Sequence, residues 1–296
     1  MADWKEKFLE RYENLTNIDK FTEASLQPMR KSIRVNTIKT DIKTIKSRFK
    51  DLKPVKWCKE GFFIQGKAIG NTLEHQLGYI YLQGAASMIP PVVLKPKKED
   101  IVLAMCASPG SKTSQMAAMM ENKGIIVAND NKMLRMKPLT ANLQRCGVAN
   151  TVSTRMEGRW FKQKFDKILL DAPCSGIGTI RKSYQTIGMW NPNTIKKFAG
   201  IQRQLIETAF NCLEENGTMI YSTCTLEPDE DEAVLDFLIN KYDNAKIENF
   251  SLDIKRGSVN TDFEGQSFDS DVKKALKVWP QDNDTEGFFV SKIRKL

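Results

Sequence analysis

From residue 100 onward the chain alternates short apolar runs with amphipathic segments, and this alternation is the feature that most restricts its fold. Short apolar runs are typical of strands buried on both faces, and strand–helix alternation is typical of a doubly wound, mostly parallel sheet. The pattern predicts strands over 101–106, 125–129, 151–156, 167–171 and 218–223. It predicts helices over 113–122, 132–145 and 194–215, and another after Pro228 whose first turn carries acids suited to the helix dipole. We therefore expect an α/β fold.

The first 75 residues predict a small α/β domain of their own. Apolar residues at helical spacing, Trp4, Phe8 and Tyr12, indicate a helix near the start. Ile33 and Val35 alternate with polar neighbours, which indicates a strand. The expected elements are helices over 4–15 and 41–49 and strands over 31–37 and 55–64, and helical spacing resumes over 84–94. We expect two domains, 1–75 and 76–296.

Polar or reactive residues follow every predicted strand of the larger domain. Ligands of parallel sheets bind at the carboxyl ends of the strands. The residues at these ends are 106–112, Asp130, Glu157, 171–174 and 223–225. Their repetition along one edge of the sheet predicts a functional site there.

One segment accounts for the positive charge of the chain. The net charge is +9, and residues 30–59 contain eleven Lys or Arg but only two acids, Asp41 and Asp51. Such a segment on an otherwise balanced chain indicates a polyanionic partner, most simply a nucleic acid. A solvated lysine-rich face is the plainer alternative. We predict phosphate contacts from Lys31, Arg34, Lys39, Lys43, Lys46 and Arg48.

Composition argues against several other classes of protein. The apolar runs fall short of the roughly 20 residues of a membrane-spanning helix, so we expect no membrane partner. The six cysteines form no C-x-x-C pair, which argues against a zinc site and against a disulfide scaffold. We therefore expect no metal and a location in the reducing cytoplasm.

The segment 106–112 predicts a cofactor loop. Gly110 permits close approach of the backbone, and the N–H groups of the following helix start can bind a carboxylate. The Walker A pattern fails, because Cys106 and Ser111 occupy its two glycine positions. Asp130 could accept hydrogen bonds from both hydroxyls of a ribose, or cap the next helix. Without the G-x-G-x-x-G fingerprint, S-adenosylmethionine is favoured over a dinucleotide.

Two cysteines have the context of reactive thiols. Cys174 and Cys224 each follow a predicted strand, beside residues that constrain the backbone. A thiolate can attack carbon 6 of a cytosine, and a cation such as Lys112 or Arg181 would raise the thiolate fraction. We expect structural roles for the other cysteines, Cys58, Cys106, Cys146 and Cys212. His75, the single histidine, is expected to be structural or exposed, because nothing completes a triad with it.

Three motifs resemble those of the Sun-domain (Fmu-like) RNA 5-methylcytosine methyltransferases. They are Asp-Ala-Pro-Cys-Ser-Gly at 171–176, Ser-Thr-Cys-Thr at 222–225 and Cys-Ala-Ser-Pro-Gly-Ser-Lys-Thr at 106–113. Shorter similar segments at 34–37, 83–90, 279–280 and 287–289 extend the resemblance over nearly the whole chain. The resemblance implies a class I, Rossmann-like methyltransferase sheet with a small N-terminal RNA-contacting domain, acting on tRNA or rRNA.

The resemblance also implies roles for individual residues. Cys224 would be the nucleophile, Cys174 would assist loss of the C5 proton and release of the enzyme, and Asp171 would hold the cytosine edge. The S-adenosylmethionine site would consist of Cys106, Ala107, Ser108, Pro109, Gly110, Ser111, Lys112, Asp130, Arg135, Glu157 and Asp171. Two positions depart from the family pattern, since Ser111 replaces a usual glycine and Glu157 an expected Asp.

Two other functions stay open at this point. A DNA cytosine-5 methyltransferase would place the nucleophile in the Pro-Cys motif, at Cys174. An assembly factor would bind RNA without catalysis, but the intact cysteine pair and Asp171 favour an enzyme. We predict a monomeric RNA cytosine-5 methyltransferase, and a compact chain with one basic segment favours tRNA over rRNA as its substrate.

Overall fold

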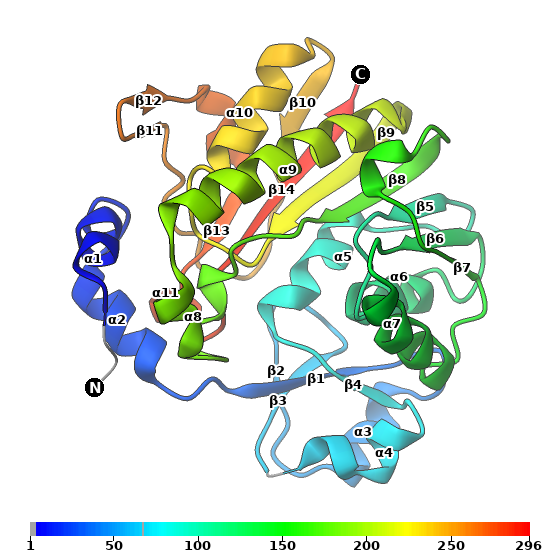
Figure 1. Ribbon diagram of the computed structural model, residues 1–296. Coiled ribbons are helices and arrows are strands. Elements are labelled where there is room, and N and C mark those ends of the chain that lie inside the picture. The colour runs from blue at the N-terminus through cyan, green and yellow to red at the C-terminus, as the bar shows by residue number, and fades with distance from the viewer. Residues whose placement is uncertain (1–3, 67) are drawn as a thin grey trace.

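A large mixed sheet forms the centre of the computed structural model, which describes residues 4–66 and 68–296 (Figure 1). Its strands are β5 Ile101–Ala104, β6 Ile125–Asn129, β7 Thr151–Thr154, β8 Phe165–Asp171, β9 Leu213–Thr223, β10 Ala245–Glu248, β13 Leu276–Val278 and β14 Phe288–Lys295. They lie in the order β10-β14-β9-β8-β5-β6-β7, with β13 paired to β14. The run from β9 to β7 is parallel, whereas β14 is antiparallel to β9 and β10. The predicted α/β class with a mostly parallel sheet is confirmed.

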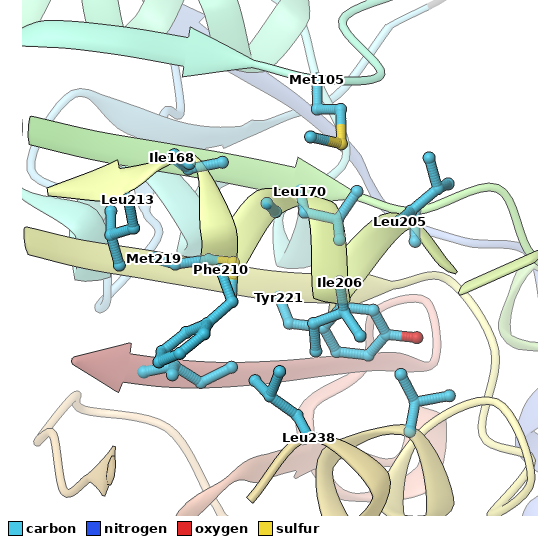
Figure 2. Close-up of a cluster of buried hydrophobic side chains, with 14 of the residues drawn as sticks. Met105, Ile168, Leu170, Leu205, Ile206, Phe210, Leu213, Met219, Tyr221 and Leu238 are labelled. Carbon is cyan, nitrogen blue, oxygen red and sulfur yellow. The ribbon is translucent and has the colours of Figure 1, made fainter. Parts of the chain in front are cut away.

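Helices cover both faces of this sheet because its strands are apolar on both sides. The covering helices are α5 Ile89–Leu94, α6 Ser111–Met119, α7 Met133–Arg145, α9 Pro192–Asn211 and α10 Glu232–Lys241. Ile168 and Leu170 of β8 pack in one cluster with Phe210 of α9 and Leu238 of α10 (Figure 2). Leu169, between them, packs in a second cluster with α5 and α6. Successive residues of β8 therefore face opposite helical layers, as the twofold period of a strand requires.

The smaller sheet is antiparallel and lies apart from the larger one (Figure 1). Its order is β2-β3-β1-β4, with bounds β2 Lys53–Pro54, β3 Gly61–Ile64, β1 Lys31–Val35 and β4 Ile80–Leu82. Helix α3, Ile42–Arg48, packs on it through Ile45, and Asp41 caps this helix by accepting a hydrogen bond from Thr44 N at 2.8 Å. Because β4 lies beyond residue 75, the small sheet extends past the expected domain boundary.

The strand predicted over 55–64 is wrong in its first half. Residues 55–60 form the turn of a hairpin, in which Val55 N donates to Gly61 O at 2.9 Å. Trp57 and Cys58 are buried against the α5 layer, and Trp57 Nε1 donates to Ala85 O at 2.8 Å. The apolar residues of this segment suggested a strand, but they are apolar because the turn packs against the interior of the protein.

The first two helices pack on the large domain and not on the small sheet. They are α1 Glu6–Glu13 and α2 Ile18–Leu26. Phe8 and Phe21 form edge contacts with Trp190 and Trp279, with ring centroids 5.5 and 5.7 Å apart. The segment after α2 then crosses to the small sheet (Figure 1). The small domain in space is thus the β1–β4 sheet with its helices, a division that the chain order alone does not reveal.

The remaining short α-helices and strands are α4 Leu73–Gln76, α8 Gln185–Met189, α11 Pro280–Asn283, β11 Asp262–Phe263 and β12 Gln266–Ser267. Within the described ranges, no helix combines the length and apolar character needed to span a membrane.

Candidate active site

Two cysteines from neighbouring strands meet at the carboxyl edge of the large sheet. Cys174 lies in the loop after β8 and Cys224 directly follows β9, and the two strands are parallel with Asp171 opposite Ser222. The Sγ atoms of Cys174 and Cys224 are 3.1 Å apart, and both thiols are free. The structure therefore brings together the two motifs that lie fifty residues apart in the chain.

The two thiols have opposite electrostatic surroundings. The pKa of Cys224 is lowered, first by its hydrogen bond with Cys174 and then by the nearby Lys112 and Lys182. The pKa of Cys174 is raised well above its ordinary value by that same hydrogen bond and by burial, with the Glu230 carboxylate adding to the effect. Cys224 is consequently the thiol of the pair that ionises first.

Asp171 is held in one orientation beside the cysteines. Lys112 Nζ donates to Asp171 Oδ2 at 2.7 Å, and Ser222 Oγ donates to Asp171 Oδ1 at 2.9 Å. Lys112 lies in the first turn of α6, and its side chain is only 11% exposed. A charge-assisted hydrogen bond from a partly buried cation fixes the geometry of the carboxylate.

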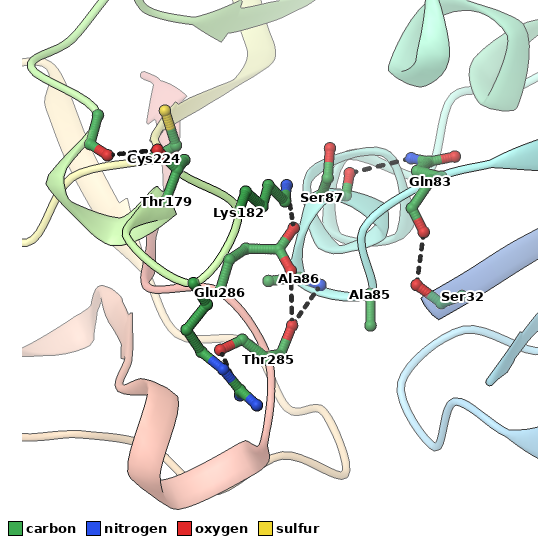
Figure 3. A network of polar contacts seen from close by, with 12 residues as sticks. Ser32, Gln83, Ala85, Ala86, Ser87, Thr179, Lys182, Cys224, Thr285 and Glu286 are labelled. Carbon is green, nitrogen blue, oxygen red and sulfur yellow. Dashed lines mark hydrogen bonds and ion pairs between the residues drawn. The ribbon is translucent and has the colours of Figure 1, made fainter. Parts of the chain in front are cut away.

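Lys112, one of the two cations expected to raise the thiolate fraction, is among the groups that lower the pKa of Cys224. The other, Arg181, is engaged elsewhere, because its buried guanidinium donates to Asp284 Oδ1 at 2.7 Å and to Pro28 O at 3.0 Å. The next residue, Lys182, also lowers the pKa of Cys224 and is paired with Glu286 at 3.2 Å (Figure 3). No local sequence signal could have found this pair, because its members lie 104 positions apart.

Acids after Cys224 were also misjudged from sequence. Only Glu232 lies in the first turn of α10, and Glu230, Asp231 and Glu232 are fully buried. Glu227, just before them, is buried too and takes hydrogen bonds from Trp190 Nε1 and Arg11 Nε at 2.8 and 2.9 Å. Most of these acids are therefore buried in contacts inside the protein and do not interact with the helix dipole. Their high density next to Thr-Cys-Thr was the sequence feature that could have indicated this.

The loop over 106–112 joins β5 to α6 beside Asp171. Gly110 has φ of 98°, a left-handed conformation that favours glycine, and it starts α6, whose N-terminus no described side chain caps. A small pocket is lined by Ala104, Cys106, Ala107, Ser108, Pro109, Ser111, Lys112, Thr113, Leu169 and Asp171. The predicted cofactor loop and Asp171 thus share one pocket, into which an uncapped helix start can offer N–H groups.

Asp130 lies beside this loop, at the end of β6. Its carboxylate is 2% exposed, and Oδ2 accepts a long 3.4 Å hydrogen bond from Ser108 N. Arg135 Nε lies 3.4 Å from the same oxygen, and Arg135 Nη2 donates to Ser108 O at 3.2 Å. The N-cap of α7 is Lys132, and Asp130 Oδ1 accepts a hydrogen bond from Lys132 N at 3.3 Å, so this carboxylate also supports the chain at the start of α7.

The acids predicted to border the cofactor site lie around Cys106, as the pKa of this thiol indicates. Burial raises its pKa to about 12, and the carboxylates of Asp130, Asp171 and Glu157 add to the rise. Glu157, after β7, accepts a hydrogen bond from Asn131 Nδ2 at 3.2 Å. Acids from three strand ends therefore lie within electrostatic range of Cys106. The predicted burial of the other structural cysteines is confirmed for Cys58, Cys146 and Cys212.

The basic segment is displayed on the small domain, with one exception. The exposed members are Lys31, Lys39, Lys43, Lys46 and Arg48. Arg34 is 1% exposed, and its guanidinium donates to Gln83 Oε1 and Ser114 Oγ, both at 2.8 Å. The predicted phosphate contact is therefore wrong for Arg34, because this face of β1 packs on α6 and joins the two domains. His75 lies in α4 of the small domain.

The described residues hold no group of three or more His, Cys, Asp or Glu that could bind a metal ion. The sheet, its carboxyl-edge pocket and the additional small domain define a Rossmann-like methyltransferase with an N-terminal domain. A family model described as 16S rRNA methyltransferase RsmB/F matches residues 91–294, and one for the N-terminal domain of 16S rRNA methyltransferase RsmF matches residues 5–85. The chain belongs to the RsmB/F family of RNA methyltransferases, which confirms the resemblance stated from its motifs.

Relatives of different length match this chain. A tRNA (cytosine(49)-C(5))-methyltransferase of Pyrococcus abyssi is 42% identical, and the match covers 99% of both chains. A ribosomal RNA small subunit methyltransferase F of Aliivibrio fischeri is 41% identical over 94% of this chain, which spans only 60% of that protein. A crystal structure of a methyltransferase homologue from Pyrococcus horikoshii superposes with a TM-score of 0.89 at 34% identity, covering 100% of this chain and 96% of that chain.

Proposed function

We propose that the protein transfers a methyl group from S-adenosylmethionine to carbon 5 of a cytosine in RNA, through a covalent bond between Cys224 and carbon 6. The observation that carries this proposal is the pair of free thiols 3.1 Å apart, of which Cys224 has the lowered pKa and Cys174 the raised one. Membership of an RNA methyltransferase family supports the same reaction class.

The residues in and beside this pocket fit S-adenosylmethionine by the chemistry of their hydrogen-bonding groups. The uncapped start of α6 would hold the carboxylate of the amino acid end, and Asp130 would accept hydrogen bonds from the ribose hydroxyls. Arg135 and Glu157 would border the same site. When bound, the cofactor would supply a methyl group from its positively charged sulfur.

Cys224 begins the reaction. Its thiolate attacks carbon 6, so a sulfur–carbon bond forms and the electron pair of the C5=C6 double bond makes carbon 5 nucleophilic. Asp171, oriented by Lys112 and Ser222, would hold the cytosine edge near N3 and the amino group during this attack. Carbon 5 then bonds to the methyl carbon, and the electrons of the broken bond stay with the donor sulfur.

Cys174 completes the reaction. Once Cys224 is bonded to carbon 6, its charge and hydrogen bond no longer raise the pKa of Cys174, and only burial and Glu230 still do. The proton of Cys174 would then pass to solvent. As a thiolate it accepts the proton of carbon 5. The electrons of that C–H bond restore the C5=C6 double bond, and Cys224 leaves with the pair of its bond to carbon 6.

The substrate we propose is tRNA. The P. abyssi relative, named for a tRNA activity, matches this chain over 99% of both lengths, whereas the rRNA methyltransferase F of A. fischeri is longer than the match. The exposed lysines of the small domain would contact phosphates. The target base must leave its stack to reach the two cysteines, which favours loops and flippable positions.

The test compares the two cysteines one at a time. Each variant is incubated with S-adenosylmethionine and a labelled tRNA transcript, then run on a denaturing gel. Cys224→Ala should yield neither methylated cytosine nor a slow protein–RNA band. Cys174→Ala should accumulate that band, because attack proceeds while release stalls, and the double variant should lose it.

The buried Cys212 supplies the matched control, since Cys212→Ala changes a thiol outside the site and should keep turnover with only a packing cost. A band that accumulates with Cys224→Ala and not with Cys174→Ala would reverse the roles. Retained turnover in both variants would refute the mechanism. An rRNA transcript methylated in preference to tRNA would overturn the substrate proposal alone.

A further inference from the structure

Behind the loop that carries Cys174 lies a buried carboxylate with no part in the steps above. Glu230 is fully buried at the end of the turn before α10. Its Oε2 accepts hydrogen bonds from Ser175 N at 2.9 Å and from Gln202 Nε2 at 2.8 Å. The carboxylate therefore holds the main chain directly after Cys174.

Gln202 holds the main chain directly before Cys174. It is fully buried on α9, and its Nε2 also donates to Pro173 O at 2.8 Å. Glu230 and Gln202 are thus joined to each other and to both neighbours of Cys174. We call this pair the Glu230–Gln202 clamp. Apart from it, Ser175 Oγ is joined to Thr225 Oγ1 at 2.9 Å, which ties the loop to the segment of Cys224.

Cys224 is supported in a different way. Its carbonyl oxygen accepts a hydrogen bond from Gly178 N at 2.9 Å, and Thr223 before it is paired with Phe289 of β14. Gly178 belongs to the same loop as Cys174, so this contact, like that of Ser175 with Thr225, ties the two segments together. The sheet position of Thr223 is the support of Cys224 that the clamp does not supply.

The clamp is costly to stability. Burial raises the pKa of Glu230 to about 7. Its second oxygen, Oε1, is buried with no hydrogen-bond partner among the described residues. An unpaired buried polar atom destabilises the folded state. A group of this kind at a site of proposed chemistry indicates a role in that chemistry, because a neutral side chain would fill the space at lower cost.

We propose that Glu230 and Gln202 are positioning residues for Cys174, holding its loop so that the sulfur reaches the C5 proton after methyl transfer. This inference rests on the proposed function, since it assigns to the clamp the release step alone. Loss of the clamp should slow release of the RNA from Cys224 and leave the initial attack almost unchanged.

Single-turnover kinetics separate these two steps. Wild type, Glu230→Ala, Glu230→Gln and Gln202→Ala are mixed with S-adenosylmethionine and the tRNA transcript, and the covalent band is followed as it forms and decays. For Glu230→Ala we expect formation within about threefold of wild type and decay slower by about tenfold or more, because small misplacements of a reacting group cost such factors. Glu230→Gln keeps an oxygen for Ser175 N and should restore decay to within about threefold of wild type.

Glu227→Gln is the control for burial as such. Glu227 is equally buried but contacts Arg11, Tyr12 and Trp190 and not the Cys174 loop, so its variant should form and clear the band like wild type. Should Glu230→Ala fail to fold, Gln202→Ala carries the same test through Pro173 O.

The outcomes are distinguishable. Formation and decay slowed by equal factors, or decay at the wild-type rate in a folded Glu230→Ala or Gln202→Ala protein, would overturn the clamp while Cys174→Ala still traps RNA. If Cys174→Ala itself traps no RNA, the proposed mechanism fails, and the role of the clamp fails with it.

Discussion

The carboxyl edge of the large sheet and the outer face of the small domain both carry many charges, but they hold them differently. At the edge, charged side chains are paired and one member of each pair is largely buried, as with Lys112 and Asp171 at 2.7 Å or Glu286 and Lys182 at 3.2 Å. On the small domain, Lys43 and Lys46 are exposed. A few fixed charges suit chemistry at one atom, whereas several exposed ones suit a surface contact.

The contrast follows from the dielectric around each charge. Two charges about 4 Å apart interact by about 1 kcal/mol in water but several times more strongly near or inside a protein. A buried charge can therefore change the pKa of a neighbour such as Cys224, while an exposed lysine contributes mainly through release of counterions from a polyanion. Removing a charge from each region should thus give effects of different kind as well as of different size.

The largest effect should come from Lys112→Met. This change removes the partner of Asp171 and one of the cations that lower the pKa of Cys224. We expect the rate of methyl transfer at saturating RNA to fall by about 10²–10³-fold, as for loss of one preorganised charge in an active site. Quenched-flow measurement of 5-methylcytosine checks this, with Lys43→Met as the exposed control. Equal rates for the two variants would show that the charges at the sheet edge and on the small domain do not differ in their effect on methyl transfer.

The next effect concerns stability against pH. The pKa of Glu230 is about 7 in the folded protein, above its ordinary 4.5, so between these values the folded state holds more protons than the unfolded chain. The free energy of unfolding therefore falls as pH rises through this window. Glu230→Gln removes this loss, and its stability relative to wild type should rise by up to about 3 kcal/mol from about pH 5 to pH 8.

Urea titrations at several pH values measure this difference. The exposed Glu99→Gln variant is the matched control and should run parallel to wild type. Parallel curves for Glu230→Gln as well would show that Glu230 does not take up a proton on folding.

Asp130→Ala should weaken binding of S-adenosylmethionine and spare binding of RNA. Hydrogen bonds to a charged group contribute about 1.5–3 kcal/mol, which predicts a loss of about tenfold or more in affinity. Isothermal titration calorimetry with each ligand checks the split, with Asp130→Asn as a variant that keeps one acceptor. Equal losses for both ligands would point to a folding defect or to a wrong assignment of the site.

Arg34→Met tests the exception within the basic segment. Arg34 is buried between the domains, so its loss should leave Gln83 and Ser114 without their partner and cost about 1–3 kcal/mol of stability. Thermal unfolding measures this cost. The dependence of RNA affinity on salt should stay that of wild type, and a flatter dependence would return Arg34 to the phosphate-binding set.

The smallest effect per substitution should come from the exposed lysines, and it should be an effect on RNA binding. Neutralising Lys43 or Lys46 should weaken RNA binding evenly across sequences and flatten the slope of log affinity against log salt by about 0.7–0.9 for each lost contact. Fluorescence anisotropy at several salt concentrations measures the slope. If neutralising Lys43 and Lys46 together leaves the slope unchanged, these lysines do not contact phosphates and form only a solvated face.

Local pattern was sufficient for the parts of the fold that depend on local contacts. The strand predicted over 125–129 has the observed bounds of β6, because its apolar run is short and sharply limited. The edge location of Cys174, Cys224 and Asp171 followed from the rule that parallel strands collect their carboxyl ends. Both inferences needed only the order of elements along the chain.

What sequence missed depends on contacts between distant residues. Nothing near β14 shows that it inserts antiparallel between β9 and β10. Arg34 lies in a basic segment, and only the packing of β1 on α6 shows that it is buried. Lys182 and Glu286, like Glu230 and Ser175, are joined across long stretches of chain that no local pattern connects.

The place of β14 has a consequence for the order of synthesis. This strand pairs with β9 from Thr218 to Thr223, and the residue before it, Gly287, donates to Gly178 O at 2.8 Å, beside Cys224. A ribosome makes the basic segment and both cysteines well before it makes β14. During that interval the nascent chain displays its basic segment, while β9 still lacks its β14 partner up to Thr223, the residue before Cys224.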